Sequence, residues 1–100
     1  GIIGLETALA LGITCLVKPG HLSLCELMKK MSFNPARLCK LDCGRLEAGA
    51  PADLVLFDEN EEWTVADFAS RAVNSPFVGE RLTGRVKYTI CEGKVVYQDR

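Results

Sequence analysis

The sequence predicts an α+β fold in which residues 1–43 form helices and residues 44–100 form strands. Apolar residues recur at helical spacing in the first part, and in short or alternating runs typical of strands in the second. Helices followed by strands indicate a segregated α+β arrangement rather than alternating βαβ units. With 100 residues, 48% of them hydrophobic and 25% charged, the chain is large enough to bury a core and too apolar for a disordered tail.

The first helix is expected from Gly4 to about Val17. This stretch is largely apolar, and Glu6 suits the positive end of a helix. The helix should end at Lys18-Pro19-Gly20, where a cation precedes two residues that break helices.

A second helix should begin at Ser23, because Ser23 and Glu26 have the spacing of a capping box. Its apolar residues fall on one face, at the spacing of core positions (Leu24, Leu27, Met28 and Met31). A third helix is expected to begin at Asn34-Pro35, since Asn accepts hydrogen bonds from free helix-start amides and Pro loses none there. Gly44 is a natural end for it.

Four short strands are expected in the second part. Residues 53–58 form an apolar run between carboxylates, which predicts a strand buried on both faces. Residues 62–65 predict a second, amphipathic strand, and residues 67–84 are irregular. Residues 85–91 and 94–97 predict a hairpin, because apolar and polar residues alternate before a Glu-Gly turn. The acidic run at 58–62 is expected to be a solvated loop.

The cysteine pattern indicates free thiols. Five cysteines, an odd number at wide spacing, and no signal-type N-terminus argue against a secreted disulfide framework and favour the cytoplasm. Three of them, Cys15, Cys25 and Cys39, lie among apolar residues and are expected to pack as small hydrophobes rather than act as exposed nucleophiles. His21, the one histidine, is expected to be a loop residue.

A metal site is a more specific alternative interpretation of His21 and three of the cysteines. His21, Cys25, Cys39 and Cys43 have the spacings H-x3-C and C-x3-C, which lack the C-x2-C knuckle of most structural zinc sites. We therefore expect no resident metal, although adventitious binding at these four residues stays open.

No self-contained active site is predicted. The chain has no glycine-rich phosphate loop, and Asp53 and Asp58 flank a strand at an odd offset that places them on opposite faces. A net charge of -1 without a basic stripe disfavours nucleic acid, and no apolar run reaches the ~18 residues of a membrane span. We expect no catalytic residue and no metal ligand in this chain.

The start of the chain and its thin strand set suggest a piece of a larger protein. It opens on Gly1, and its first methionine is Met28. Four short strands make a small sheet whose second face needs cover, either from the helices or from further chain.

Six segments spread over the whole chain carry recognisable motifs: Gly1–Thr7, His21–Leu24, Met31–Leu38, Gly44–Asp58, Asn74–Gly79 and Gly84–Tyr97. Together they resemble dihydroorotases of the longer bacterial type, within the cyclic amidohydrolase superfamily. The N-P-A and A-D-L-V segments recur across amidohydrolases, whereas G-L-E-T together with N-S-P-F is more typical of dihydroorotase.

This resemblance implies a (β/α)8 barrel with a dinuclear zinc site, and a small β-sandwich built from both termini. A barrel takes about 250 residues, so this chain would be the C-terminal remainder: the last barrel helices in 1–43 and sandwich strands in 44–100. The implied enzyme interconverts dihydroorotate and N-carbamoyl-L-aspartate in pyrimidine biosynthesis. Its metal ligands and catalytic aspartate have no counterpart here, so the isolated chain is expected to be inactive and to bind no zinc.

One residue matches a binding position of the family. The substrate loop of the family reads A-P-F-G just before I-x-G-L-E-T, so Gly1 falls on its final glycine, whose backbone contacts the substrate. A glycine allows backbone to approach a ligand closely.

Other interpretations keep part of this assignment. The chain could belong to an allantoinase or dihydropyrimidinase-like enzyme, or to a non-catalytic dihydroorotase-like scaffold for aspartate carbamoyltransferase. It could also be a free-standing α+β binding module. Beyond substrate, the expected partners are the rest of its own polypeptide, a second copy in a homodimer, and aspartate carbamoyltransferase; nucleic acid and membranes are not expected.

Overall fold

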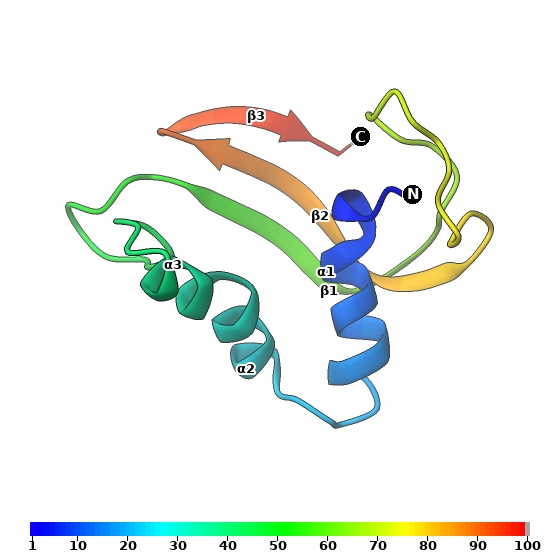
Figure 1. Cartoon of the computed structure of the whole chain (residues 1–100), viewed down its shortest axis with the longest axis horizontal. Coiled ribbons are helices and arrows are strands. Elements are labelled where there is room, and N and C mark those ends of the chain that lie inside the picture. Colours follow the sequence, from blue (N-terminus) through cyan, green and yellow to red (C-terminus); the bar gives the residue numbers. More distant parts are fainter. Residues whose placement is uncertain (100) are drawn as a thin grey trace. The chain divides into compact units, whose positions relative to one another are not determined.

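The computed structural model describes residues 1–99, and the last position of the predicted strand region, residue 100, lies outside them. Helical elements occupy the first part of the chain and a three-stranded sheet of order β1-β2-β3 the second, as predicted (Figure 1). The chain forms two compact units, which are described separately: Gly1–His21 with Asp58–Arg85, and Leu22–Phe57 with Val86–Arg100.

The first helical stretch matches the predicted helix. It consists of a 3-10 turn (Leu5–Thr7), the helix α1 (Ala8–Gly12) and a π-helical segment (Ile13–Val17). It ends before Gly20, whose φ of 90° is readily adopted only by glycine.

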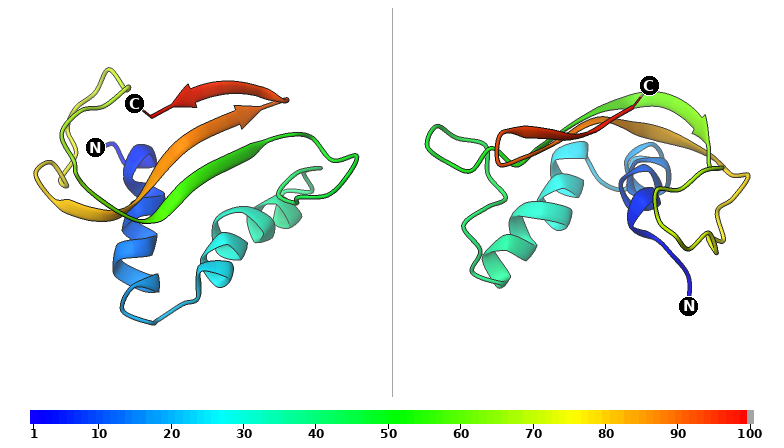
Figure 2. Two further views of the ribbon diagram at one scale, coloured as in Figure 1. Left: turned by 180° about the vertical axis from the view of Figure 1, so that it is seen from behind. Right: turned by 90° about the horizontal axis from the view of Figure 1, so that it is seen from above.

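The second and third predicted helices are one continuous helical stretch, so a separate start at Asn34 was wrong. Helix α2 (Leu24–Met28) passes through a π-helical segment (Lys29–Phe33) into α3 (Asn34–Leu38) (Figure 2). Asn34 has helical backbone angles, and no side-chain cap bond is present at the start of α3. The wider π turns precede Pro35, where proline cannot donate the backbone hydrogen bond that an α-helix would require. The Ser23 capping box is present as predicted.

The first strand is longer than predicted. Strand β1 (Leu54–Thr64) joins the two expected strands and includes the acidic run that was expected to be a loop. Burial on both faces was also wrong, because Val55 and Leu56 are 45% and 48% exposed. Within residues 1–99, other residues cover only part of β1, so its apolar run is not packed on both faces of the strand.

The C-terminal hairpin is confirmed. Strands β2 (Arg81–Cys91) and β3 (Lys94–Gln98) pair antiparallel, with Cys91 opposite Lys94 and Thr89 opposite Tyr97. Both turn residues have positive φ, 50° for Glu92 and 79° for Gly93. This is the backbone form of a type I′ turn, which matches the twist of the paired strands.

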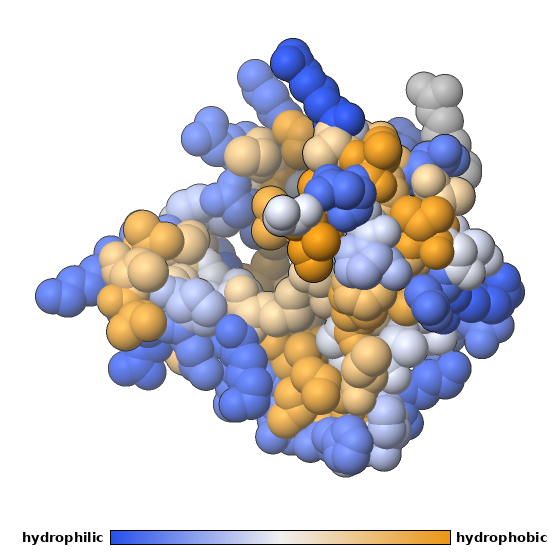
Figure 3. All heavy atoms as spheres, turned by 45° about the vertical axis from the view of Figure 1, so that its right-hand side comes forward, coloured by the Kyte–Doolittle hydropathy of each residue, from blue (hydrophilic) through white to orange (hydrophobic). Residues whose placement is uncertain are grey.

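Each unit has a small buried centre. In the first unit it consists of Ala10, Val65 and Leu82, with Trp63 and Phe77 among the partly buried residues packed on it. In the second unit Leu27 and Ala36 are buried, but Met31, expected in the core stripe, is 42% exposed. Figure 3 shows hydrophobic side chains, in orange, at the surface of the molecule.

The cysteines are also more exposed than predicted. Cys15, Cys25 and Cys39 are all exposed, so the expectation that they pack as buried hydrophobes was wrong for residues 1–99. Among residues 1–99, the buried residues of the two helical stretches are Thr7, Ala10, Ile13, Leu27 and Ala36, so these cysteines lie on the uncovered part of each stretch. No helix in the described part of the chain is both long and apolar enough to cross a membrane.

Candidate functional site

The candidate site is the N-terminal segment around Gly1, the one residue singled out from the sequence for ligand contact. Gly1 is exposed, and the space around its α-carbon is open, with no atom within 4 Å of where a β-carbon would stand. The side-chain amide Nδ2 of Asn74 donates a hydrogen bond to the Gly1 carbonyl oxygen. The backbone at Gly1 is thus held by a side chain from a distant part of the sequence.

Glu6 forms a second tie between the same two segments. Its Oε1 accepts a hydrogen bond from the Ala69 backbone N–H at 3.0 Å, and its Oε2 accepts one from Ser70 N–H at 3.2 Å. A carboxylate that accepts two backbone N–H groups is a charge-assisted, two-point contact. Glu6 therefore fixes the loop 66–80 against the start of the first helical stretch.

The N-terminal segment is also braced from within. The side chain of Thr7, which is 2% exposed, donates through Oγ1 to the Gly4 carbonyl at 3.3 Å. The Thr7 backbone N–H donates to the same carbonyl at 3.4 Å. Gly4 is thereby joined to the helical turn that carries Glu6.

The loop 66–80 is ordered by its own hydrogen bonds. Ser70 Oγ accepts from Ala72 N–H at 3.3 Å, and Ser75 Oγ accepts from Phe77 N–H at 3.1 Å. These are local side-chain-to-backbone turns of the kind that serine favours. Asn74 lies between the two turns, so its position is set on both sides.

The end of this loop is anchored in the core of the first unit. Phe77 packs on the buried centre, and the Gly79 N–H donates to the Val65 carbonyl at 2.8 Å. The Val65 N–H in turn donates to the Glu80 carbonyl at 2.9 Å. The loop that presents Asn74 is thus built on the most buried residue of the unit, Val65, which is 1% exposed.

Glu6 and Asn74 were not identified as site residues from the sequence. The sequence placed Glu6 only at a helix end and Asn74 only in an irregular loop, although both stand in segments that resemble the family. Their pairing with residues 63 to 73 positions away could not be seen in the local pattern.

The residues of the alternative metal interpretation do not form a metal site. His21, Cys25 and Cys39 are exposed and Cys43 is half-buried. Among residues 1–99, no group of three or more His, Cys, Asp or Glu side chains could hold a metal ion. The donors within residues 1–99 therefore do not fit the zinc of the implied enzyme.

The two strand carboxylates are used separately. Asp53 Oδ1 accepts from the Glu92 backbone N–H at 2.9 Å, at the hairpin turn. Asp58 Oδ1 accepts from the Asn60 N–H at 2.8 Å, within β1. Asp53 thus holds a hairpin turn 39 positions away, and Asp58 bonds a backbone group of its own strand.

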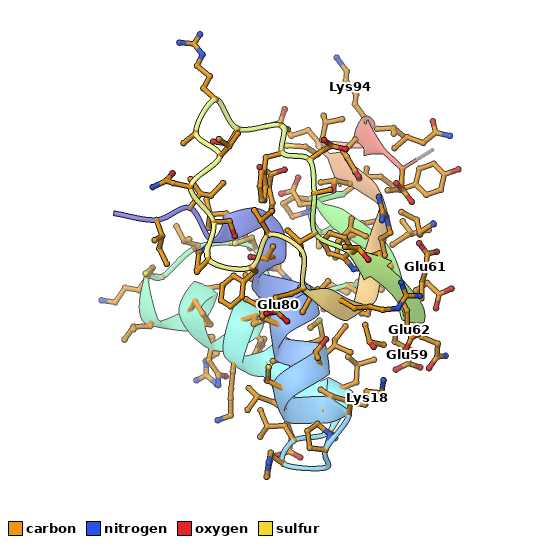
Figure 4. The ribbon with its side chains drawn as sticks, turned by 90° about the vertical axis from the view of Figure 1, so that its right-hand side faces the viewer. Lys18, Glu59, Glu61, Glu62, Glu80 and Lys94 are labelled. Atoms are coloured by element: carbon orange, nitrogen blue, oxygen red, sulfur yellow. The ribbon has the colours of Figure 1, made fainter. Side chains whose placement is uncertain are left out.

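Three charged side chains in the first unit form exposed ion pairs. Glu62 lies 3.8 Å from Lys18 and 3.5 Å from Arg81, and Figure 4 shows Lys18 and Glu62 among the labelled residues. All three side chains are at least half exposed, and ion pairs of this kind contribute little stability.

Glu26 and Cys91, both in the second unit, have shifted pKa values. The pKa of Glu26 is lowered by its hydrogen bonds with the Ser23 backbone and side chain, the capping box, with smaller contributions from nearby lysines. The pKa of the Cys91 thiol is raised by the atoms packed around it and by the carboxylates of Asp53 and Glu92.

Comparison with known proteins gives consistent matches along the whole chain. The sequence profile of the amidohydrolase family matches residues 2–96. Dihydroorotases of Clostridioides difficile (strain 630) and Streptococcus thermophilus (strain CNRZ 1066) are each 60% identical, over 97 and 99 residues. The chain spans about a quarter of the length of these relatives, 23% and 24%.

Solved structures give the same picture of the backbone. The L-hydantoinase (dihydropyrimidinase) of Arthrobacter aurescens superposes with a TM-score of 0.90 at 36% identity, over 98% of this chain and 23% of that protein. The D-hydantoinase of Bacillus sp. AR9 superposes with a TM-score of 0.76 at 25% identity, over 91% of this chain and 21% of that protein.

Proposed function

Because the chain belongs to the amidohydrolase family, we propose that it is the C-terminal part of a dihydroorotase. The whole enzyme would interconvert dihydroorotate and N-carbamoyl-L-aspartate. The observation that carries the proposal is the 60% identity to a dihydroorotase over 97% of this chain. A hydantoinase structure shares 36% identity over a similar span, which gives the dihydropyrimidinase-like alternative less support.

In this proposal the helices of residues 1–43 complete a barrel and the strands of residues 44–100 belong to a small sandwich. Strong apolar exposure supports the presence of further protein against this chain. Leu5, Leu38 and Leu46 are 94%, 84% and 81% exposed, and within residues 1–99 exposed large hydrophobic residues outnumber buried ones, whereas extensive exposed apolar surface marks an interaction site. The rest of the same polypeptide is the partner we propose for them.

The chain's own contribution to the reaction would be binding rather than chemistry. Zinc chemistry would reside in the rest of the enzyme, since the donors of residues 1–99 do not fit a metal ion. Gly1 would place its backbone against the substrate ring, where the absence of a side chain leaves room. The five free cysteines support a reducing compartment, the cytoplasm, for the whole enzyme.

The test is an assay of the full-length enzyme with four substrates. We expect hydrolysis of dihydroorotate, and cyclisation of N-carbamoyl-L-aspartate, to exceed hydrolysis of hydantoin or allantoin by at least about a hundredfold in kcat/KM, the discrimination expected of a site built for one polar substrate. Faster turnover of hydantoin or allantoin would reassign the substrate. Absence of all turnover by a zinc-loaded enzyme would favour a non-catalytic scaffold.

A further inference from the structure

We propose that Asn74 is a positioning residue for substrate binding, because its side-chain amide holds the Gly1 carbonyl and thereby fixes the backbone that meets the substrate. This role rests on the proposed function and on the place of Gly1 in it. Asn74 itself would not touch the reacting atoms.

The hydrogen bond from Asn74 orients the backbone at Gly1. Asn74 Nδ2 donates to the Gly1 carbonyl oxygen, and the backbone around Gly1 has no side chain of its own to hold it. A peptide unit is planar, so fixing the carbonyl of Gly1 also fixes the direction of the N–H of residue 2. One side-chain amide thus orients a backbone acceptor and the neighbouring donor together.

The position of Asn74 is itself well determined. The Ser70 and Ser75 turns lie on either side of it, and Phe77 anchors the end of the loop on the buried centre. Glu6 adds two hydrogen bonds from the helical side, to Ala69 and Ser70. The loop is therefore stiff enough for one amide to transmit position to Gly1, which is what a supporting residue of a binding site must do.

Few side chains could replace Asn74 as the hydrogen-bond donor to the Gly1 carbonyl. The Gly1 carbonyl needs a donor, so an aspartate at position 74, with the same shape but only acceptor oxygens, would repel it. Glutamine keeps the donor on a longer arm. Alanine removes the donor without adding charge.

The experiment uses the full-length enzyme with Asn74→Asp, Asn74→Ala and Asn74→Gln. We expect Asn74→Asp to raise the KM for dihydroorotate about 5- to 20-fold with kcat within about twofold, as for loss of one hydrogen bond that supports binding. Asn74→Gln should recover part of the loss. Asn60→Asp is the matched control: it makes the same chemical change on β1, where the Asn60 side chain forms no hydrogen bond within residues 1–99, and it should leave KM unchanged.

The KM-to-kcat split separates positioning from simple destabilisation. Loss of folded enzyme lowers the active fraction and therefore kcat, but it leaves KM as it was. If the aspartate variant fails to fold, Asn74→Ala is judged on the same criterion. A KM within twofold of wild type in a folded, active variant would overturn the role of Asn74 alone, whereas a wild-type enzyme without dihydroorotate turnover would overturn the proposed function as well.

Discussion

Replacement of Gly84 by alanine should destabilise the first unit strongly. Gly84 lies within β2 with a φ of 102°, a backbone conformation that residues with a β-carbon rarely adopt. A β-carbon at this position would stand 2.6 Å from Cδ1 and 3.3 Å from Cβ of Ile13, which is 2% exposed. The helical stretch therefore packs directly on the backbone of the strand.

Two energetic costs determine how strongly Gly84→Ala should destabilise the first unit. A non-glycine residue at such a φ costs about 1–2 kcal/mol. The overlap with Ile13 is far inside the ~3.5–4.0 Å optimum for carbon atoms, and overpacking of this kind costs about 1–3 kcal/mol. Gly84→Ala should therefore lower the free energy of unfolding by about 2–5 kcal/mol.

The strand also has little freedom to move away. The Gly84 carbonyl accepts a hydrogen bond from Trp63 Nε1 at 2.8 Å. Next to it, the Thr83 N–H donates to Thr14 Oγ1 at 2.8 Å, and Thr14 Oγ1 donates to the Thr83 carbonyl at 3.2 Å. A shift of β2 that relieved the overlap would stretch these three hydrogen bonds.

The assay is urea unfolding of the 100-residue chain at low micromolar concentration, followed by the fluorescence of its one tryptophan, Trp63. Gly20→Ala is the control for the backbone term, because Gly20 has a φ of 90° but no atom within 4 Å of the place that a β-carbon would take. It should lose only about 1–2 kcal/mol. Ile13→Val in the Gly84→Ala background should restore about 1 kcal/mol or more, since it removes the closest atom.

Two results would refute the reasoning. Equal losses for Gly84→Ala and Gly20→Ala would mean that the contact with Ile13 contributes nothing. Purely additive effects of Ile13→Val and Gly84→Ala, in a double-mutant cycle, would mean that the two positions do not press on each other.

Three further outcomes are expected for the second unit, and one for the chain as a whole. Ser23→Ala, which removes half of the capping box, should cost about 1 kcal/mol in urea unfolding. The folded pKa of Glu26 lies below 4.5, so the stability that this carboxylate contributes is present above pH 4.5 and is lost as the pH falls through the folded pKa. The free energy of unfolding of Glu26→Gln should therefore depend less on pH in this acidic range than that of the unsubstituted chain. An unchanged acid profile would contradict this prediction. Asp53→Asn should speed iodoacetamide labelling of Cys91 at pH 8, measured by peptide mass spectrometry, since it removes one cause of the raised thiol pKa; equal rates would argue against it. The isolated chain should self-associate through its exposed apolar residues, so its size-exclusion volume should fall with rising concentration, whereas a constant monomer volume would support the free-standing module.

Elements with local signals were predictable from the sequence. The first helical stretch, the Ser23 capping box and the Glu92-Gly93 hairpin each depend on residues within a few positions of one another. The continuous α2–α3 stretch was missed because Asn34-Pro35 is a good helix start in isolation, and the π-helical turns that accommodate it leave no signature of their own. Strand β1 was divided because its acidic residues resemble a loop, although strand pairing requires only backbone groups.

The candidate site was predictable only in part. Gly1 could be selected through a family resemblance, but its partner could not, because nothing local marks an asparagine in a loop as the donor to a residue 73 positions earlier. The same holds for Glu6, whose local role at a helix end is satisfied without any knowledge of Ala69 and Ser70. The exposure of Cys15 and Cys39 was mispredicted since apolar neighbours in sequence do not ensure burial.

The two bonds of Glu6 have a consequence for the order of folding. They close chain segments of 63 and 64 residues, and the entropy lost on closing a loop rises with its length. Contacts of such high sequence separation form after the local helix turns and the hairpin, which need only neighbouring residues. All contacts between the first helical stretch and residues 66–85, including the Thr14–Thr83 bonds, span such separations, so this packing as a whole should become ordered after the local turns.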